Sequence, residues 1–219
     1  MKNTILLLIV LFSLYSCSND DYLVDGGVAD SNVKMSTYDF LKSNKQLDTL
    51  ALLIERADMI AAVNAKSTTL FAPNNSSIKR YVNYILVKKL KLDPQATFTV
   101  NDIPVADLKV MLGNYIFNET IDRSKLVKQG KIYKTLSGEE RLLSLEPVAQ
   151  YAGQLDNFPE YVFYTFKGGA VWDPTDNISD DPLEGDWKTV VRTSNLVSTN
   201  GIIHVLQGYH IFSNYIPTP

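Results

Sequence analysis

The segment Thr69-Leu70-Phe71-Ala72-Pro73-Asn74-Asn75 joins a short apolar run to a proline and two asparagines. β-Branched and apolar residues favour a buried strand, and Pro73 ends it because proline has no backbone N–H to donate. Asn74 or Asn75 can cap the helix that follows. The segment therefore predicts a strand over residues 68–72 and then a helix to Leu90. The inward-facing stripe expected on that helix consists of Ile78, Tyr81, Val82, Ile85, Leu86 and Leu90.

A second segment near the C-terminus, Asn200-Gly201-Ile202-Ile203-His204-Val205-Leu206, also predicts a strand. Asn200 and Gly201 predict a tight turn before it, because both residue types tolerate a positive φ. The apolar side chains after this turn point to both sides of the chain. That pattern is typical of a strand buried on both faces.

The rest of the chain places helices first and strands later. The expected helices cover residues 37–43, with Ser36 as the cap, 47–57 and 105–112. The expected strands cover residues 141–145, 161–166, 189–193 and 201–206. This order indicates an α+β fold rather than an alternating parallel α/β plan. The stripe on the second helix consists of Leu47, Leu50, Leu53, Ile54 and Ala57.

The two quoted segments, in this order, resemble the fasciclin (FAS1) domain family. Residues 69–75 are similar to the family's T-x-F-A-P-x-N segment, and residues 200–206 are similar to its N-G-x-I-H-V segment. The resemblance covers residues 35–213. It implies a wedge-shaped, β-sandwich-like core with several helices packed on it, and it implies adhesion or binding rather than catalysis.

This sequence also departs from the family in two places. Members often carry a Tyr-His pair that some animal proteins use for integrin binding, but here Tyr115 is followed by Ile116. We therefore expect no integrin-type role by that route. Residues 156–188 are longer and richer in aromatic residues than the hairpin of a minimal domain, so we expect the ligand-contacting surface there.

Residues 1–17 resemble a bacterial lipoprotein signal. Lys2 gives a basic start, the run from Ile5 to Leu14 is mostly apolar, and Leu14-Tyr15-Ser16-Cys17 resembles a lipobox. The run is shorter than the about 20 apolar residues of a spanning helix. Cys17 is the only cysteine, and lipobox chemistry needs a thiol at that position. We expect a cleaved signal peptide over residues 1–16 and a lipid anchor at Cys17; the alternative is an ordinary signal peptide with an incidental cysteine.

The residues after Cys17 predict a flexible tether. Residues 17–34 are polar and acidic and contain Asp25-Gly26-Gly27, so they bury little apolar surface. Acidic residues soon after an acylated cysteine resemble the export signal of surface lipoproteins in Bacteroidota. The expected organisation is one domain over residues 35–213 and a tail over 214–219, anchored in the outer membrane and exposed at the cell surface.

Composition argues against several classes of function. The net charge is −3 and no basic stretch is long, so we expect no nucleic-acid partner. If Cys17 is acylated, no thiol remains for a disulfide, a cysteine nucleophile or a thiolate metal site. The chain has two histidines, and a zinc site needs more ligands than these. We expect no metal and no cofactor.

His204 and His210 are open to two interpretations. Either could act as a catalytic base, but no Ser-His-Asp arrangement can be placed around them. The favoured interpretation of His204 is a buried histidine with one ring nitrogen bonded to the backbone. His210 is expected in a strand near the end of the domain.

The most aromatic and acidic part of the chain lies between residues 156 and 188. Asp173, Asp176, Asp180 and Asp181 could supply oxygen ligands to Ca²⁺, but the EF-hand spacing is missing and a solvated acidic loop is favoured. Trp172 and Trp187 flank this loop and could stack on sugar rings. The candidate ligand-binding residues are therefore Trp172, Trp187, Asp173 and Asp176, with core packing of the rings as the alternative.

The leading function is a lipid-anchored, non-catalytic module that binds a surface protein or a polysaccharide. A second hypothesis is a structural or accessory subunit of an outer-membrane complex, such as one for glycan uptake or a surface fibre. A third is a glycan-active enzyme, although no pair of carboxylates can be placed at the separation that such chemistry needs.

Overall fold

A computed structural model describes residues 30–148, 159–173 and 185–214. Its strands form one seven-stranded sheet in the order β2-β1-β7-β6-β5-β4-β3. Only β1 and β7 pair in parallel, whereas every other neighbouring pair is antiparallel. With helices before most of the strands, the α+β class is confirmed. The strands are β1 (Thr68–Ala72), β2 (Ile116–Phe117), β3 (Lys131–Lys134), β4 (Glu140–Pro147), β5 (Glu160–Phe166), β6 (Trp187–Val197) and β7 (Gly201–Leu206).

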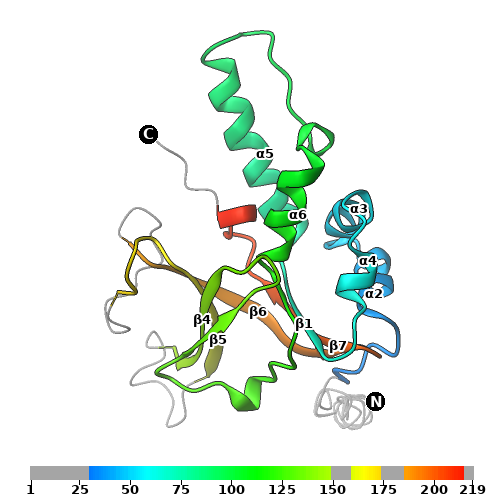
Figure 1. The fold of residues 1–219 in the computed structure, drawn as a ribbon, viewed down its shortest axis with the longest axis vertical. Coiled ribbons are helices and arrows are strands. Elements are labelled where there is room, and N and C mark those ends of the chain that lie inside the picture. The colour runs from blue at the N-terminus through cyan, green and yellow to red at the C-terminus, as the bar shows by residue number, and fades with distance from the viewer. Residues whose placement is uncertain (1–29, 149–158, 174–184, 215–219) are drawn as a thin grey trace, which may run out of the picture. The chain divides into compact units, whose positions relative to one another are not determined.

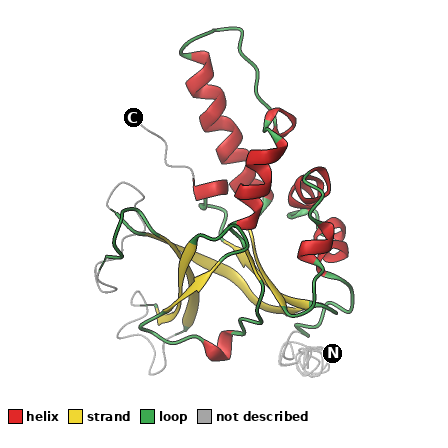
Figure 2. Ribbon diagram, in the orientation of Figure 1, coloured by secondary structure: helices red, strands yellow, loops and turns green. Residues whose placement is uncertain are grey.

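The helices lie on the side of the sheet where β1 and β7 run (Figure 1, Figure 2). They are α2 (Thr37–Ser43), α3 (Asp48–Arg56), α4 (Ile60–Val63), α5 (Asn75–Leu90) and α6 (Val105–Gly113). Short 3₁₀ turns lie at η3 (Val100–Asp102), η4 (Arg123–Lys125) and η7 (Phe212–Asn214). Each helix and strand that the sequence predicts is present, with ends that shift by a few residues. The strands β2 and β3 were not expected.

The two segments that resemble the fasciclin motifs lie side by side as β1 and β7. Their register pairs Phe71 with His204, and the two rings stack with centroids 4.6 Å apart. All five residues of β1 are buried, because β2 and β7 flank it and the helices cover it. This parallel pair therefore forms the middle of the core.

Two asparagines connect β1 to the helices. Asn74 caps α5 by accepting a hydrogen bond from the Ser77 backbone N–H at 3.0 Å. Asn75 accepts one from the Thr49 N–H at 3.2 Å and donates to the Asp48 carboxylate at 2.7 Å. The strand–proline–asparagine segment thus fixes the start of α5 and the start of α3 at the same point.

Asn200 holds the opposite end of the pair. Its side-chain oxygen accepts from the Thr37 N–H at 2.9 Å, and its amide donates to the Val63 carbonyl at 3.1 Å. The predicted positive φ at Asn200 and Gly201 is wrong, because neither residue is among those with positive φ. Gly201 is required for another reason: a Cβ there would lie 1.9 Å from the Thr68 carbonyl oxygen.

The apolar stripes differ between α3 and α5. All five apolar residues of the stripe predicted for the helix over residues 47–57 are buried, so that prediction is confirmed for α3. On α5 only Ile78 of the predicted stripe is fully buried, whereas Val82, Ile85 and Leu86 are half-buried and Leu90 is exposed. The stripe prediction is wrong beyond Tyr81, because α5 extends past the sheet and leaves the core behind (Figure 1).

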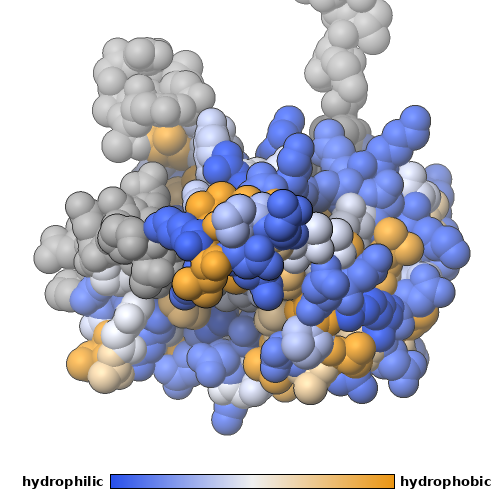
Figure 3. Space-filling model, turned by 90° about the horizontal axis from the view of Figure 1, so that it is seen from above, coloured by the Kyte–Doolittle hydropathy of each residue, from blue (hydrophilic) through white to orange (hydrophobic). Residues whose placement is uncertain are grey.

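The end of α5 presents apolar side chains among lysines. Leu92, just after the helix, is 87% exposed, and Val87 is 54% exposed. Seen from above, the surface shows apolar residues interspersed with hydrophilic ones (Figure 3).

None of the helices in the described ranges has the length and hydropathy that crossing a membrane requires.

The folded part begins earlier than predicted. Val33 N–H donates to the Val197 carbonyl at 2.9 Å, and Val197 N–H donates to the Ser31 carbonyl at 2.8 Å. The compact unit of the described chain begins at Ser31. Residues 31–34 therefore belong to the folded unit and not to the tether predicted over residues 17–34. The predicted signal peptide, Cys17, most of that tether and most of the tail lie outside the described residues.

Both histidines are in the core. His204 is fully buried; its Nε2–H donates to the Ile121 carbonyl at 2.9 Å, and its Nδ1 accepts from the Asn195 N–H at 3.4 Å. The interpretation as a buried histidine bonded to backbone is confirmed. Burial lowers the pKa of His204 to about 4. The hydrogen bond to Ile121 and the charge of Asp122 raise this pKa, but by less than burial lowers it.

His210 belongs to a buried cluster of polar aromatic residues. It does not lie in a strand, as predicted, but in the turn after β7. Its Nε2 shares a hydrogen bond with the Tyr115 hydroxyl at 2.7 Å, and Arg141 Nε donates to the Tyr164 hydroxyl at 2.8 Å. Burial, and then the charge of Arg141, lowers the pKa of His210 to about 3. Tyr115 is therefore a core residue.

We predict that Gly201→Ala lowers the free energy of unfolding by about 2 kcal/mol or more, because the added methyl group overlaps the backbone of β1. Gly169→Ala is the matched control, since the nearest atom to its Cβ would be the Val171 oxygen at 4.0 Å. The control should change the free energy by less than about 0.5 kcal/mol. Urea unfolding measures both, and equal values for the two variants would contradict the close approach.

We also predict that stability falls as the pH drops from about 6.5 towards 4, since the unfolded chain takes up protons on both histidines before the folded chain does. Each histidine contributes a slope of up to about 1.4 kcal/mol per pH unit. His210→Gln should remove one of these contributions. Urea unfolding between about pH 6.5 and pH 5, above the range of most carboxylates, measures the slope. The same slope in variant and wild type would exclude His210 as a source.

Candidate functional site

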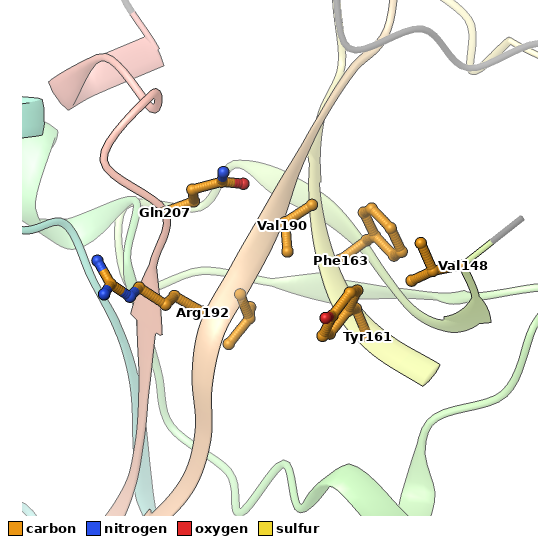
Figure 4. Close-up of a pocket in the computed structure, with 7 residues that line it drawn as sticks. Val148, Tyr161, Phe163, Val190, Arg192 and Gln207 are labelled. Atoms are coloured by element: carbon orange, nitrogen blue, oxygen red, sulfur yellow. The ribbon is translucent and has the colours of Figure 1, made fainter. Parts of the chain in front are cut away.

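The outer face of the sheet carries a pocket over β5, β6 and β7. Its volume is about 430 Å³. Tyr161 and Phe163 lie on one side of Val190 together with Val148, and Arg192 and Gln207 lie on the other side (Figure 4). The pocket therefore has an aromatic and aliphatic half beside a polar half.

A β-bulge places Arg192 at this position. Val191 pairs with Leu206 and Thr193 pairs with Val205, so β6 has one extra residue, Arg192, against β7. A bulge of this kind turns a side chain away from the regular alternation. Arg192 is exposed, and its side chain points away from Tyr161 and Phe163 (Figure 4).

Arg192 also lines two adjoining pockets. One, of about 310 Å³, lies against the start of α5, and the other, of about 340 Å³, lies between β6, β7 and the segment that joins α2 to α3. Arg192 lines all three pockets, and we call them together the Arg192 groove. Its residues used below are Lys45, Gln46, Val148, Tyr161, Phe163, Val190, Arg192 and Gln207.

Four polar side chains in this groove are uncommitted. Within the part of the chain that the structure describes, no hydrogen bond or ion pair engages the side chains of Lys45, Gln46, Arg192 and Gln207. By contrast, the neighbouring Asn74 and Asn75 side chains are occupied in holding α3 and α5. Polar side chains that converge on a pocket without partners are typical of a ligand-binding site.

The described residues of the groove carry positive charges and no negative ones. No Asp or Glu is among its described lining residues. The nearby Lys188 is neutralised, because its ammonium lies 3.1 Å from a Glu146 carboxylate oxygen and 5.0 Å from the Phe163 ring centroid. Arg192 and Lys45 have no such partner among the residues that the structure describes, so the groove favours an anionic group.

The two tryptophans predicted to bind ligand do not form a joint surface. Trp187 is 6% exposed and packs against His210, with ring centroids 6.0 Å apart. It is a core residue, which corrects its prediction as an exposed anchor; it only contributes to a small pocket next to the Arg192 groove. Trp172 is half-buried, donates to Glu140 at 3.3 Å and has the Lys167 ammonium over its ring at 5.6 Å.

The predicted acidic residues have structural contacts where the structure describes them. Asp173 accepts from the Asp186 N–H at 2.7 Å, and Asp186 accepts from the Asp173 N–H at 2.7 Å. This reciprocal pair closes the base of the insertion and occupies the Asp173 carboxylate. Asp176, Asp180 and Asp181 lie outside the described residues. Within the described ranges no group of three His, Cys, Asp or Glu residues could hold a metal ion.

Sequence reasoning did not find the Arg192 groove. Its residues come from the α2–α3 connection, β5, β6 and β7, and their separation along the chain gives no local motif. The alternation of Tyr161 and Phe163 on β5 marks one exposed face of a strand, and this was the one available signal. The bulge that exposes Arg192 has no signature in the sequence.

The comparison with protein-family models agrees with this fold. The family described as fasciclin domain matches residues 45–208, which is more than half of the chain. A search of curated proteins finds no match. Among solved structures, the chain is similar to a FAS1 domain pair from the insect cell adhesion molecule fasciclin I, with 11% identity and a TM-score of 0.40 over 80% of this chain. The match covers 44% of that chain, so this chain spans less than half its length. The chain belongs to the fasciclin domain family.

Proposed function

We propose that this protein is a lipid-anchored module of the cell surface that binds a polysaccharide or protein partner without catalysis. The chain is a FAS1 domain, a module of the cell-adhesion type. The observation that carries the proposal is the Arg192 groove, which combines four uncommitted polar side chains with an aromatic and aliphatic part.

The arrangement of the groove suits binding rather than reaction. Both histidines are held in the core by backbone or tyrosine partners and do not reach the groove. The groove offers guanidinium, ammonium and amide groups, which orient a ligand through hydrogen bonds. Its described lining contains no carboxylate to act as a general acid or base.

The proposed anchor is the lipid on Cys17. This cysteine follows an apolar run and a lipobox-like Leu14-Tyr15-Ser16. Stable attachment to a membrane takes more than one acyl chain, and a triacylated cysteine provides them. Residues 18–30 would then act as the tether between the lipid and the folded unit.

We predict that Tyr161→Ala weakens binding to native envelope polysaccharide at least about tenfold, because it removes the half-buried ring that gives the groove its apolar side. Ile132→Ala is the control, since it removes an exposed apolar side chain on β3, outside the groove. Binding is measured with labelled purified protein, and the polysaccharide is recovered to check its chain length. Equal affinities of Tyr161→Ala and wild type, or new chain ends in the recovered material, would contradict the proposal.

We predict that Cys17→Ala abolishes acylation and releases the protein from the membrane fraction, because the chain has no other cysteine. Metabolic labelling with a fatty-acid analogue measures the acylation. Ser18→Ala serves as a control that leaves the thiol in place. Label retained by the Cys17→Ala variant would refute the anchor.

A further inference from the structure

We infer that the Arg192 groove binds an acidic glycan, in which the sugar rings carry carboxylate groups. The inference rests on the proposed function and narrows it to a class of ligand. It is drawn from the charge of the groove, from the chemistry of its uncommitted side chains and from the position of the groove on the sheet.

The charge of the groove calls for an anion. Arg192 and Lys45 line the same pocket at the start of α5, and neither has an acidic partner among the described residues. An arginine presents its donors as a planar fork that matches the two oxygens of a carboxylate. Because Lys188 is already paired with Glu146, Arg192 and Lys45 set the preference for negative charge.

The other uncommitted groups suit hydroxyls. Gln46 and Gln207 each offer an amide that donates and accepts hydrogen bonds, which matches a sugar hydroxyl that does the same. Tyr161 and Val190 add apolar surface to the pocket that Gln207 lines (Figure 4). A ligand with carboxylates, many hydroxyls and apolar ring faces satisfies all three parts of the groove at once.

The position on the sheet disfavours an acidic peptide. The groove lies over β5, β6 and β7, which are interior strands with neighbours on both sides. An extended peptide gains affinity mainly by adding main-chain hydrogen bonds at a free sheet edge, and the edges here are β2 and β3. The ligand must therefore be held by side chains, as a glycan is.

The test uses a short oligogalacturonate and its methyl ester, which keeps the rings and hydroxyls but removes the charge. Calorimetric titration of the purified protein should show binding of the acid form and at least ~10-fold weaker binding of the ester. Arg192→Gln should weaken binding of the acid form by a similar factor, and Arg192→Lys by less, because it keeps the charge and loses the fork. Lys109→Gln, which removes an exposed cation of α6 outside the groove, should leave binding unchanged.

The outcomes separate this inference from the proposed function. Equal binding of the acid and the ester, or equal binding by Arg192→Gln and wild type with the same melting temperature, would overturn the inference. If oligogalacturonate does not bind while envelope binding still depends on Tyr161, the ligand class is wrong and the binding module remains. If the protein binds neither oligogalacturonate nor envelope polysaccharide, both the inferred ligand class and the proposed binding function are wrong.

Discussion

The parallel contact between β1 and β7 is the interaction on which the other elements depend. Gly201 lies so close to the Thr68 carbonyl that only hydrogen fits at its α-carbon, and this approach brings Phe71 against His204. At one end of the pair Asn74 and Asn75 fix the starts of α5 and α3. At the other end Asn200 fixes α2 and the end of α4. The helices are thus positioned from the two ends of one strand pair.

The buried polar groups follow from this arrangement. His204 is placed inside the sheet by its register with Phe71, so it has to be neutral and bonded to backbone. A second buried group near η7 contains two hydrogen-bonded pairs, Tyr115 with His210 and Arg141 with Tyr164, and leaves Arg141 Nη2 without a partner among the described residues. Buried polar groups of this kind are tolerated when their hydrogen bonds are made. Burial disfavours the charged form of a histidine, and it therefore lowers the pKa values of His204 and His210.

The elements around the two fasciclin-like segments could be predicted because their signals are local. A proline after an apolar run, an asparagine cap and a glycine before a strand act over a few residues. The burial of the stripe on α3 was predictable for the same reason. The stripe on α5 was not, since periodicity cannot show where a helix leaves the core. The role of Gly201 was assigned to a turn, whereas it is set by Thr68, which is remote in sequence.

The candidate site could not be predicted for a related reason. A bulge in β6 exposes Arg192. The other residues of the Arg192 groove come close to it only in the folded sheet, in which β7 pairs in parallel with β1. The aromatic and acidic insertion was the predicted ligand-contacting surface because its residues are close in sequence. Trp187, however, is drawn into the core by its place on β6, opposite Phe166.

Amide hydrogen exchange of β1 and β7 tests the central role of this strand pair most directly. We predict that the hydrogen-bonded amides of residues 69–72 and 202–206 exchange last, and only through global unfolding. The edge strand β3 and the outer turns of α5 should exchange earlier. Exchange of β1 and β7 before β4 and β5 would show that the fold is held together elsewhere and would contradict the account.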